Sequence, residues 1–323
     1  MNCPPTFIAE TTSIRQILSL LRCIGFLSKV QVQINSDGLT FMVEDSRVMQ
    51  GNVFVDKKLF TQYVFNGLSN DRPLPNPEGL GNDHPADDDN GDSEKGVSFG
   101  ISLSALLECL QIFGAETATR ERWNQPALSS TMATRPAALG TEQERKSGKC
   151  TLIYQGEGYP LQVVLEEDNL STSCTLTTYE PDDVEEFLLD QPLTKKIIMK
   201  ADWLYDAIQE LDGSSPDRLI ISASPRHPFF SLSSTGPMGS TSVEFSNERS
   251  LLETFQVPTP VQNIYKFHLI KHAARAMAIA TKVSIRGDSR GILSLQFMIT
   301  INKVMSFVDF RYLPFQDDSD NDD

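Results

Sequence analysis

The sequence predicts an α+β fold made of two similar domains, each with antiparallel sheets and two helices. Residues 150–167 read CTLIYQGEGYPLQVVLEE and residues 283–299 read VSIRGDSRGILSLQFMI, and each reads as a strand, a turn and a second strand. Each hairpin follows an apolar helix that ends a strand–helix unit. Because 323 residues is also a length typical of about two domains, we interpret the chain as a duplication.

The first half opens with strand Phe7–Glu10 and a helix over about residues 11–24, for which Thr11 or Thr12 offers an N-cap. Apolar residues at helical spacing form its buried stripe: Ile14, Ile17, Leu18, Leu21 and Ile24. A turn sequence, Asn-Ser-Asp-Gly at 35–38, joins the next two strands. The elements expected in this half are strands Val30–Ile34, Leu39–Val43, Met49–Val55 and Val97–Ile101, helix Leu103–Phe113, hairpin 150–167 and strand Ser171–Thr178.

The second half repeats this order. The expected elements are strand Lys196–Lys200, helix Asp202–Leu211, strands Leu219–Ala223, Phe229–Ser233, Ser242–Phe245 and Ile264–His268, helix Leu269–Ala280, hairpin 283–299 and strand Met305–Leu313. Two polar segments, 66–96 and 115–149, interrupt the first half and are expected to be flexible insertions. We therefore predict an N-terminal domain at 1–180, a linker at 181–194, a C-terminal domain at 195–315 and an acidic tail at 316–323.

Composition excludes several classes of protein. No apolar run approaches the roughly 20 residues that cross a bilayer, so no membrane span is expected. The start MNCPPTFIAE lacks a basic region followed by an apolar stretch, so we expect no secretory signal. The five cysteines are scattered and never spaced as CxxC, which favours reduced thiols in the cytosol or nucleus over disulfides or zinc.

The net charge of −15 argues against nucleic acid as a partner, but its distribution changes this interpretation. Three loop-like or terminal segments hold the acidity: 66–96 carries −6, 166–190 carries −9 and 317–323 carries −5. The rest of the chain is therefore mildly basic, at about +5.

Basic residues gather on two of the four expected helices. Arg15 and Arg22 share a face of the first helix opposite its apolar stripe, and Lys271 and Arg275 share a face of the last. Helix 103–113 has no base, and helix 202–211 carries Asp202, Asp206 and Glu210. From these residues alone, an ordinary solvated helix face explains the bases better than a nucleic-acid contact does.

Three stretches carry a resemblance: VSIRGDSRGILSLQFMI, VSFGISLSALLECLQIFG and YQGEGYPLQVVLEE. They resemble the RAD-one family of subunits of the DNA-damage checkpoint clamp (the nine-one-one complex), relatives of PCNA, and the match runs in order from about Phe7 to Pro314. The resemblance implies a PCNA-like DNA clamp fold in a ring with nine-type and HUS-type subunits. In such rings helices line a hole for duplex DNA. The implied role is nuclear and non-catalytic: a clamp, placed at damage by a clamp loader, that recruits repair and checkpoint proteins.

The resemblance also implies site residues. The DNA-facing bases would be Arg15, Arg22, Lys271 and Arg275, with Lys29 and Lys282 as weaker candidates just beyond two of the helices. A partner-binding pocket beneath the linker would use Val43, Arg47, Val48, Phe187, Leu188, Tyr312, Leu313 and Pro314. Because the linker sequence departs from that of PCNA, we expect a pocket of different selectivity. The apolar residues at 187–189 could also simply pin the linker to the sheet.

Two alternative functions stay open. A metal-dependent 3′–5′ exonuclease needs rigidly held carboxylates, and the Asp-x-Glu pairs Asp92/Glu94 and Asp183/Glu185 both lie in acidic stretches expected to be flexible. A checkpoint scaffold that binds proteins but not DNA is the other. His268 and His272 are four residues apart, but Leu269 stands where the HExxH pattern needs Glu, so we expect no metal site and no cofactor.

Overall fold

The computed structural model describes residues 4–67, 96–114, 148–167, 170–301 and 304–315. Most of the two expected insertions and all of the acidic tail lie outside these residues. The first half contains β1 (Phe7–Thr11), α1 (Ile14–Cys23), β2 (Lys29–Ile34), β3 (Gly38–Asp45), β4 (Met49–Asp56), a 3₁₀ turn (Lys57–Leu59), β5 (Gln62–Phe65), β6 (Val97–Ser102), α2 (Leu103–Gly114), β7 (Lys149–Tyr154), β8 (Leu161–Glu167) and β9 (Leu170–Leu176).

The second half begins after an extended segment at 180–193. Its elements are β10 (Lys195–Lys200), α4 (Ala201–Asp212), β11 (Arg218–Ala223), β12 (Phe230–Gly236), β13 (Gly239–Phe245), β14 (Leu252–Gln256), β15 (Val261–Lys266), α5 (Phe267–Lys271), α6 (Ala274–Ile279), β16 (Lys282–Gly287), β17 (Leu293–Ile301) and β18 (Val304–Tyr312).

The strands repeat with an offset of nine. In the first half β4-β3-β2-β6 and β5-β1-β7-β8-β9 are hydrogen-bonded in order, and in the second half β13-β12-β11-β15 and β14-β10-β16-β17-β18 follow the same two orders. Each strand of the first half therefore has a counterpart nine strands later. This correspondence is the duplication that the sequence predicted.

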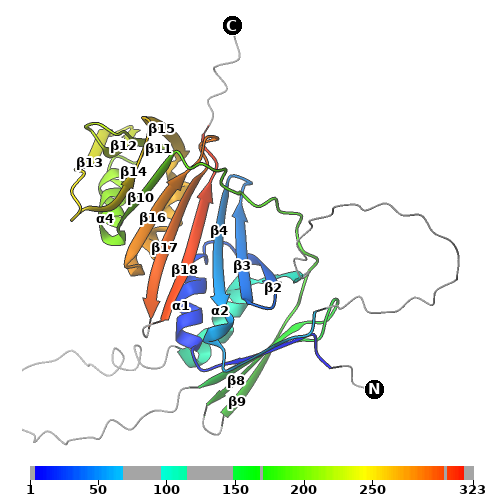
Figure 1. Cartoon of the computed structure of the whole chain (residues 1–323). Coiled ribbons are helices and arrows are strands. Elements are labelled where there is room, and N and C mark those ends of the chain that lie inside the picture. The colour runs from blue at the N-terminus through cyan, green and yellow to red at the C-terminus, as the bar shows by residue number, and fades with distance from the viewer. Residues whose placement is uncertain (1–3, 68–95, 115–147, 168–169, 302–303, 316–323) are drawn as a thin grey trace, which may run out of the picture.

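The two halves are joined by one shared sheet. Strand β18 pairs antiparallel with β4 from Phe307↔Phe54 to Tyr312↔Met49, so a four-stranded sheet of the first half and a five-stranded sheet of the second become one nine-stranded sheet. Figure 1 shows these strands side by side, with β18 and β4 next to each other.

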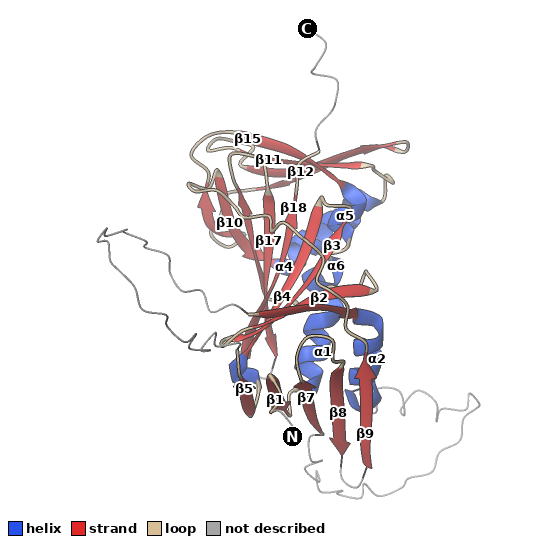
Figure 2. Ribbon diagram, turned by 90° about the vertical axis from the view of Figure 1, so that its right-hand side faces the viewer, coloured by secondary structure: helices blue, strands red, loops and turns tan. Residues whose placement is uncertain are grey.

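The helices cover one face of this central sheet. Helices α1 and α2 contact each other, α1 contacts α6, and α6 contacts α4, which gives a helical layer in the order α2-α1-α6-α4. Figure 2 shows α1 and α2 behind β7, β8 and β9, and α2 also contacts β8 and β9. We call the sheet surface under the helices the helical face, and the opposite surface, which carries Gln50, Phe307 and Arg311, the outer face.

Helix α1 illustrates why these residues fold as they do. Its stripe of Ile14, Ile17, Leu18 and Leu21 is buried, and burial of such a side chain contributes about 1.5–3 kcal/mol. Its N-cap is Ser13, without a side-chain cap bond. The prediction of Thr11 or Thr12 was wrong, because Thr11 ends β1 and its hydroxyl donates to the Leu59 carbonyl at 2.6 Å.

The expected helix 269–280 is broken. The structure has α5 and α6, with the N–H groups of His272 and Ala273 donating to carbonyls three residues back, at 3.1 and 3.0 Å. Such bonds tighten the turn and redirect the chain. Two short strands, β5 and β14, were also missed by the sequence analysis. None of the described helices has the length and apolar character needed to cross a membrane.

Candidate nucleic-acid interface and linker site

Three of the predicted DNA-facing bases lie on the two middle helices of the helical layer, α1 and α6, and the fourth lies on the short helix α5 just before α6. Arg15 and Arg22 are on α1, Arg275 is on α6, and Lys271 ends α5. Arg15, Lys271 and Arg275 are exposed, whereas Arg22 is half-buried. The fold therefore brings these cations from both halves of the chain to one surface, where α1 meets α6.

Arg22 and Lys271 contact the flanking helices. The Arg22 guanidinium donates to Gln111 Oε1 of α2 at 3.0 Å, and Lys271 Nζ lies 2.8 Å from Asp212 Oδ2 at the end of α4. Both side chains of the Lys271–Asp212 pair are about a third or more exposed, at 45% and 34%. Such a solvated pair contributes about 0–1 kcal/mol, so a phosphate can compete for the lysine at little cost.

The flanks of the layer are not basic. The exposed residues of α2 include Ser104, Glu108 and Gln111, and those of α4 include Asp202, Asp206 and Glu210. The described helical layer is thus cationic at its centre and acidic or neutral at its sides. A strip of this kind suits phosphate contact along one path and carries no means of base readout.

The two weaker candidates lie elsewhere. The first residues of β2 and β16, Lys29 and Lys282, face away from the helices. Lys29 Nζ sits 5.9 Å from the centroid of the Tyr179 ring, and Lys282 Nζ lies 2.6 Å from Glu253 beside Met298 and Phe307. Side chains alternate between the two faces of a strand, so position within the strand, not closeness to the helix in sequence, decides the face.

The linker crosses the outer face over β4 and β18. Gln50, which is fully buried, donates from Nε2 to the Glu185 carbonyl at 2.6 Å and accepts from the Phe187 N–H at 3.0 Å. Its amide therefore makes backbone-type hydrogen bonds to the linker on both sides of Glu186. One buried side chain thus fixes the linker over β4.

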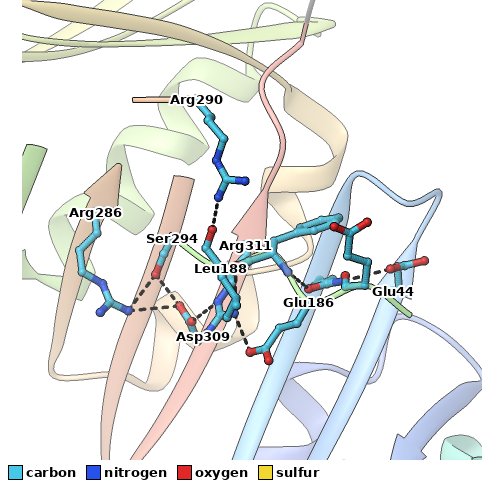
Figure 3. A network of polar contacts seen from close by, with 11 residues as sticks. Glu44, Glu186, Leu188, Arg286, Arg290, Ser294, Asp309 and Arg311 are labelled. Carbon is cyan, nitrogen blue, oxygen red and sulfur yellow. Dashed lines mark hydrogen bonds and ion pairs between the residues drawn. The ribbon is translucent and has the colours of Figure 1, made fainter. Parts of the chain in front are cut away.

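Arg311 holds the same segment from β18. Its guanidinium donates to Glu186 Oε1 at 2.7 Å, to the Phe187 carbonyl at 2.9 Å and to Asp309 Oδ2 at 2.8 Å. Asp309 also accepts from the Ser294 hydroxyl at 2.6 Å, which continues the network into β17 (Figure 3). Only 17% of the Arg311 side chain and 12% of the Asp309 side chain are exposed, so this ion pair is shielded from water.

The far end of the linker is tied to the turn between β16 and β17. Arg290 contacts the Leu188 carbonyl, and its Nε lies 2.9 Å from Asp190 Oδ2. Asp288 in the same turn is buried and accepts from the N–H groups of Ile292, at 2.8 Å, and Asp190, at 3.2 Å. Sequence analysis missed Gln50, Arg290 and Arg311 as linker anchors, because each acts across about 100 residues or more.

The predicted partner pocket is divided in the structure. Val43 and Arg47 line a cavity of about 540 Å³ between the outer face and the first part of the linker, with Tyr179, Asp183 and Val184. The other predicted residues, Val48, Tyr312, Leu313 and Pro314, line a second cavity of about 210 Å³, together with Tyr265, Lys266, Leu269 and Phe315. Phe187 and Leu188 are not among the lining residues of either, and Leu188 is 61% exposed.

The second cavity is lined mainly by apolar side chains, and one of its lining residues, Tyr312, has a buried hydroxyl group. Burial raises the pKa of Tyr312 well above its ordinary value, and its hydroxyl has no hydrogen-bond partner among the described residues. By contrast the Tyr265 hydroxyl donates to the Gly291 carbonyl at 2.8 Å. An unpaired buried hydroxyl of this kind costs about 1–3 kcal/mol.

Within the described residues, no group of three or more His, Cys, Asp or Glu side chains could hold a metal ion. Of the carboxylates named for the exonuclease alternative, Asp183 and Glu185 lie in the linker, and Asp92 and Glu94 lie outside the described residues. His272 stacks on Phe26 with ring centroids 4.3 Å apart and lies 3.5 Å from Asp45 Oδ2. Burial lowers the pKa of this histidine, and its contacts join the two halves of the chain.

Comparison with known proteins agrees with this architecture. Residues 6–299 match the family model described as repair protein Rad1/Rec1/Rad17. The DNA damage checkpoint control protein rad1 of Schizosaccharomyces pombe is 34% identical, over 95% of this chain and 86% of that protein. The cell cycle checkpoint protein RAD1 of Homo sapiens is 30% identical, over 91% of this chain and 86% of that protein. A more distant relative, named DNA repair exonuclease REC1, from Mycosarcoma maydis, is 21% identical over 91% of this chain and 88% of that protein.

The fold has solved counterparts. The crystal structure of PCNA from Thermococcus kodakaraensis superposes with a TM-score of 0.64 at 18% identity, over 96% of this chain and 100% of that chain. At this identity the likeness shows the fold, which is the PCNA-like α+β fold that the sequence predicted. The chain belongs to the Rad1/Rec1/Rad17 family of DNA-damage checkpoint and repair proteins, and it has the fold of a PCNA-like clamp.

Proposed function

We propose that this chain is a non-catalytic subunit of a three-subunit ring that encircles duplex DNA in the nucleus. The other two subunits are the nine-type and HUS-type chains. A dedicated loader places the ring at damaged sites, and the ring recruits repair factors and checkpoint signalling proteins. The bases Arg15, Arg22, Lys271 and Arg275 line the hole and contact phosphates.

The main support for the proposal is that the duplication gives the paired strands β18 and β4 two counterparts that are each left at the edge of a sheet. Inside the chain, β18 pairs with β4. Their counterparts at an offset of nine are β9 and β13, and both lie at the open edge of a sheet. An open edge invites pairing with another chain. If β9 of one chain pairs with β13 of a neighbour as β18 pairs with β4, successive chains continue in one rotational sense and can close into a ring.

The two open strands are matched to each other. Each has seven residues, and the two strands share one pattern in which exposed residues alternate with half-buried residues and a buried residue closes the strand. Leu170 at the start of β9 is 61% exposed, an apolar side chain left in water. Charge also suits the ring: the cations lie where α1 meets α6, on the side of the sheets that such a ring turns inward.

The test of assembly is co-expression with the two partner subunits. Native mass spectrometry should detect a one-to-one-to-one complex, and the chain alone should not form a closed trimer. A stable homotrimer of this chain would contradict the heteromeric ring.

The test of DNA contact is charge reversal at the four bases. The combined variant Arg15→Glu, Arg22→Glu, Lys271→Glu and Arg275→Glu, assembled with its partners, should be retained less on closed circular DNA, with a weaker salt dependence. Each lost phosphate contact lowers the slope of log K against log salt by about 0.9. A matched control is Lys57→Glu with Lys58→Glu, two exposed bases of the 3₁₀ turn. Unchanged loading of the quadruple variant would favour a scaffold that binds proteins only.

A further inference from the structure

A further surface feature lies on the outer face of the C-terminal half, beside the end of the linker. A cavity of about 570 Å³ opens there over β10, β16, β17 and β18. Its apolar floor is formed by Leu193, Ile198, Met298 and Phe307. We call this the outer groove. It lies on the face opposite the helical layer and is formed by neither β9 nor β13, so the proposed ring does not use it.

The outer groove continues into exposed apolar residues. Strand register places Phe54, Phe307, Met298 and Lys282 in one row across four strands. Phe54 is 39% exposed, Phe307 is 45% exposed, and Met305, two residues before Phe307 on the same face, is 63% exposed. Outward positions of an antiparallel sheet that faces water are normally polar, so a contiguous apolar row there indicates a contact surface.

Three cations surround this floor. Lys196, Lys282 and Arg286 line the outer groove, and Glu253 is its one acidic lining residue among the described part of the chain. Glu253 is engaged by Lys282 at 2.6 Å, so the remaining charge is positive. This local excess of positive charge stands in a chain whose net charge is −15.

Arg286 has unused donor capacity. One terminal nitrogen donates to the Ser294 hydroxyl at 3.0 Å and lies 3.8 Å from Asp309 Oδ1. Its Nε is buried and has no hydrogen-bond partner in the described structure. Arg286 lines the outer groove, so a carboxylate that enters the groove can gain a charge-assisted contact with its guanidinium.

We infer that the outer groove binds an acidic peptide segment that carries aromatic or branched aliphatic side chains. The carboxylates meet Lys196, Lys282 and Arg286, and an apolar side chain covers Ile198, Met298 and Phe307. Duplex DNA fits less well, because a phosphate backbone gains nothing from an apolar floor. A second copy of this chain fits less well too, because a self-complementary contact would place the same three cations against each other.

The test is fluorescence anisotropy with the full-length chain and a labelled peptide, Glu-Asp-Leu-Phe-Glu-Asp-Leu-Phe-Asp-Glu. Two matched peptides separate the contributions: one has Ser in place of Leu and Phe, and the other has Gln and Asn in place of Glu and Asp. We expect saturable, salt-sensitive binding of the first peptide, and binding at least about tenfold weaker for both controls, which is about 1.4 kcal/mol.

Protein variants locate the binding site. Phe307→Ser and Lys196→Glu should each weaken binding about fivefold or more, since each removes one of the two contributions. Lys58→Glu is the matched control, because Lys58 is an exposed base whose side chain is 82% accessible, and it should bind as the parent does. Phe307→Ser and Lys196→Glu change different residues of the surface, so a folding defect in one variant still leaves the binding result of the other informative.

Four results would overturn the inference. The first is no saturable binding up to about 1 mM peptide. The second is equal binding by Phe307→Ser, Lys196→Glu and the parent. The third is displacement of the peptide by a short DNA duplex with no effect of Phe307→Ser, which would make the surface a general polyanion site. The fourth is dimerisation in sedimentation that is abolished by Phe307→Ser, which would instead assign the groove to a second copy.

Discussion

Replacing Arg311 by Ala should release the linker and destabilise the chain by about 3 kcal/mol. The largest part comes from Asp309, whose side chain is 12% exposed and would lose its partner at 2.8 Å. Asp309 would still accept the hydrogen bond from the Ser294 hydroxyl at 2.6 Å, so it would lose only part of its stabilising contacts. The bond to the Phe187 carbonyl adds about 1 kcal/mol, and the half-exposed Glu186 adds less than that.

Two measurements report this change. Urea unfolding of the full chain gives the loss of stability, and amide hydrogen exchange gives the loss of linker protection. The Phe187 N–H, which donates to Gln50 at 3.0 Å, should exchange faster in Arg311→Ala than in the parent. Lys58→Ala is the control, since its partner Asp56 is 3.8 Å away and its side chain is 82% exposed. A stability loss below about 0.5 kcal/mol, with linker exchange unchanged, would refute the proposed anchoring.

Three further predictions follow from buried polar groups. Gly287→Ala would place a Cβ 2.8 Å from Lys195 Cε and should destabilise the chain by about 1–3 kcal/mol, measured by urea unfolding. Burial lowers the pKa of Lys195 from 10.5 to about 8, so the unfolded chain binds more protons and stability should rise by up to about 3 kcal/mol between these pH values. That contribution should disappear in Lys195→Met when unfolding is measured across the pH range. Gln50→Leu removes the bonds to Glu185 and Phe187 and should cost about 2 kcal/mol with faster linker exchange.

Each of these has a matched comparison. Gly239→Ala probes a glycine with no atom within 4 Å of an added Cβ but with a φ of +127°, so any cost there comes from the backbone alone. Burial also raises the pKa of Cys23 to about 12, which lowers stability at alkaline pH, so the Lys195 effect is read as the difference between parent and Lys195→Met. Identical pH profiles for the two proteins would contradict the assignment to Lys195. Unchanged exchange in Gln50→Leu would show that the linker is held elsewhere.

Local patterns in the sequence predicted most of the fold. The helical stripe of α1 and the paired turn sequences of the two hairpins are short-range signals, and the structure contains all three elements. The missed strands, β5 and β14, are short and each pairs with one neighbour at a sheet edge. The burial pattern of β5 has no buried residue, so its sequence carries little alternation to detect. His272, at the break between α5 and α6, contacts Phe26 and Asp45, which the sequence does not place beside it.

The candidate site residues likewise fall into two groups: those that local sequence patterns could place and those that they could not. The four helix bases could be placed on one surface because helical spacing and the duplication both constrain them. Lys29 and Lys282 could not, since each begins a strand and a shift of one residue reverses the face. The pocket divides because the path of the linker is set by Gln50 and Arg311, whose linker partners are more than 120 residues away in sequence. Contacts at that separation leave no local pattern.

In the proposed ring, the continuous pairing of β4 with β18 would limit how the ring can open to admit DNA. Separating the two halves would break the backbone ladder from Phe307↔Phe54 to Tyr312↔Met49, together with the linker bonds of Arg311 and Gln50 across it. A contact between separate chains in that ring would not be crossed by this linker. In the proposed ring, DNA should therefore enter at a contact between subunits, while the two halves of each chain stay paired through β4 and β18.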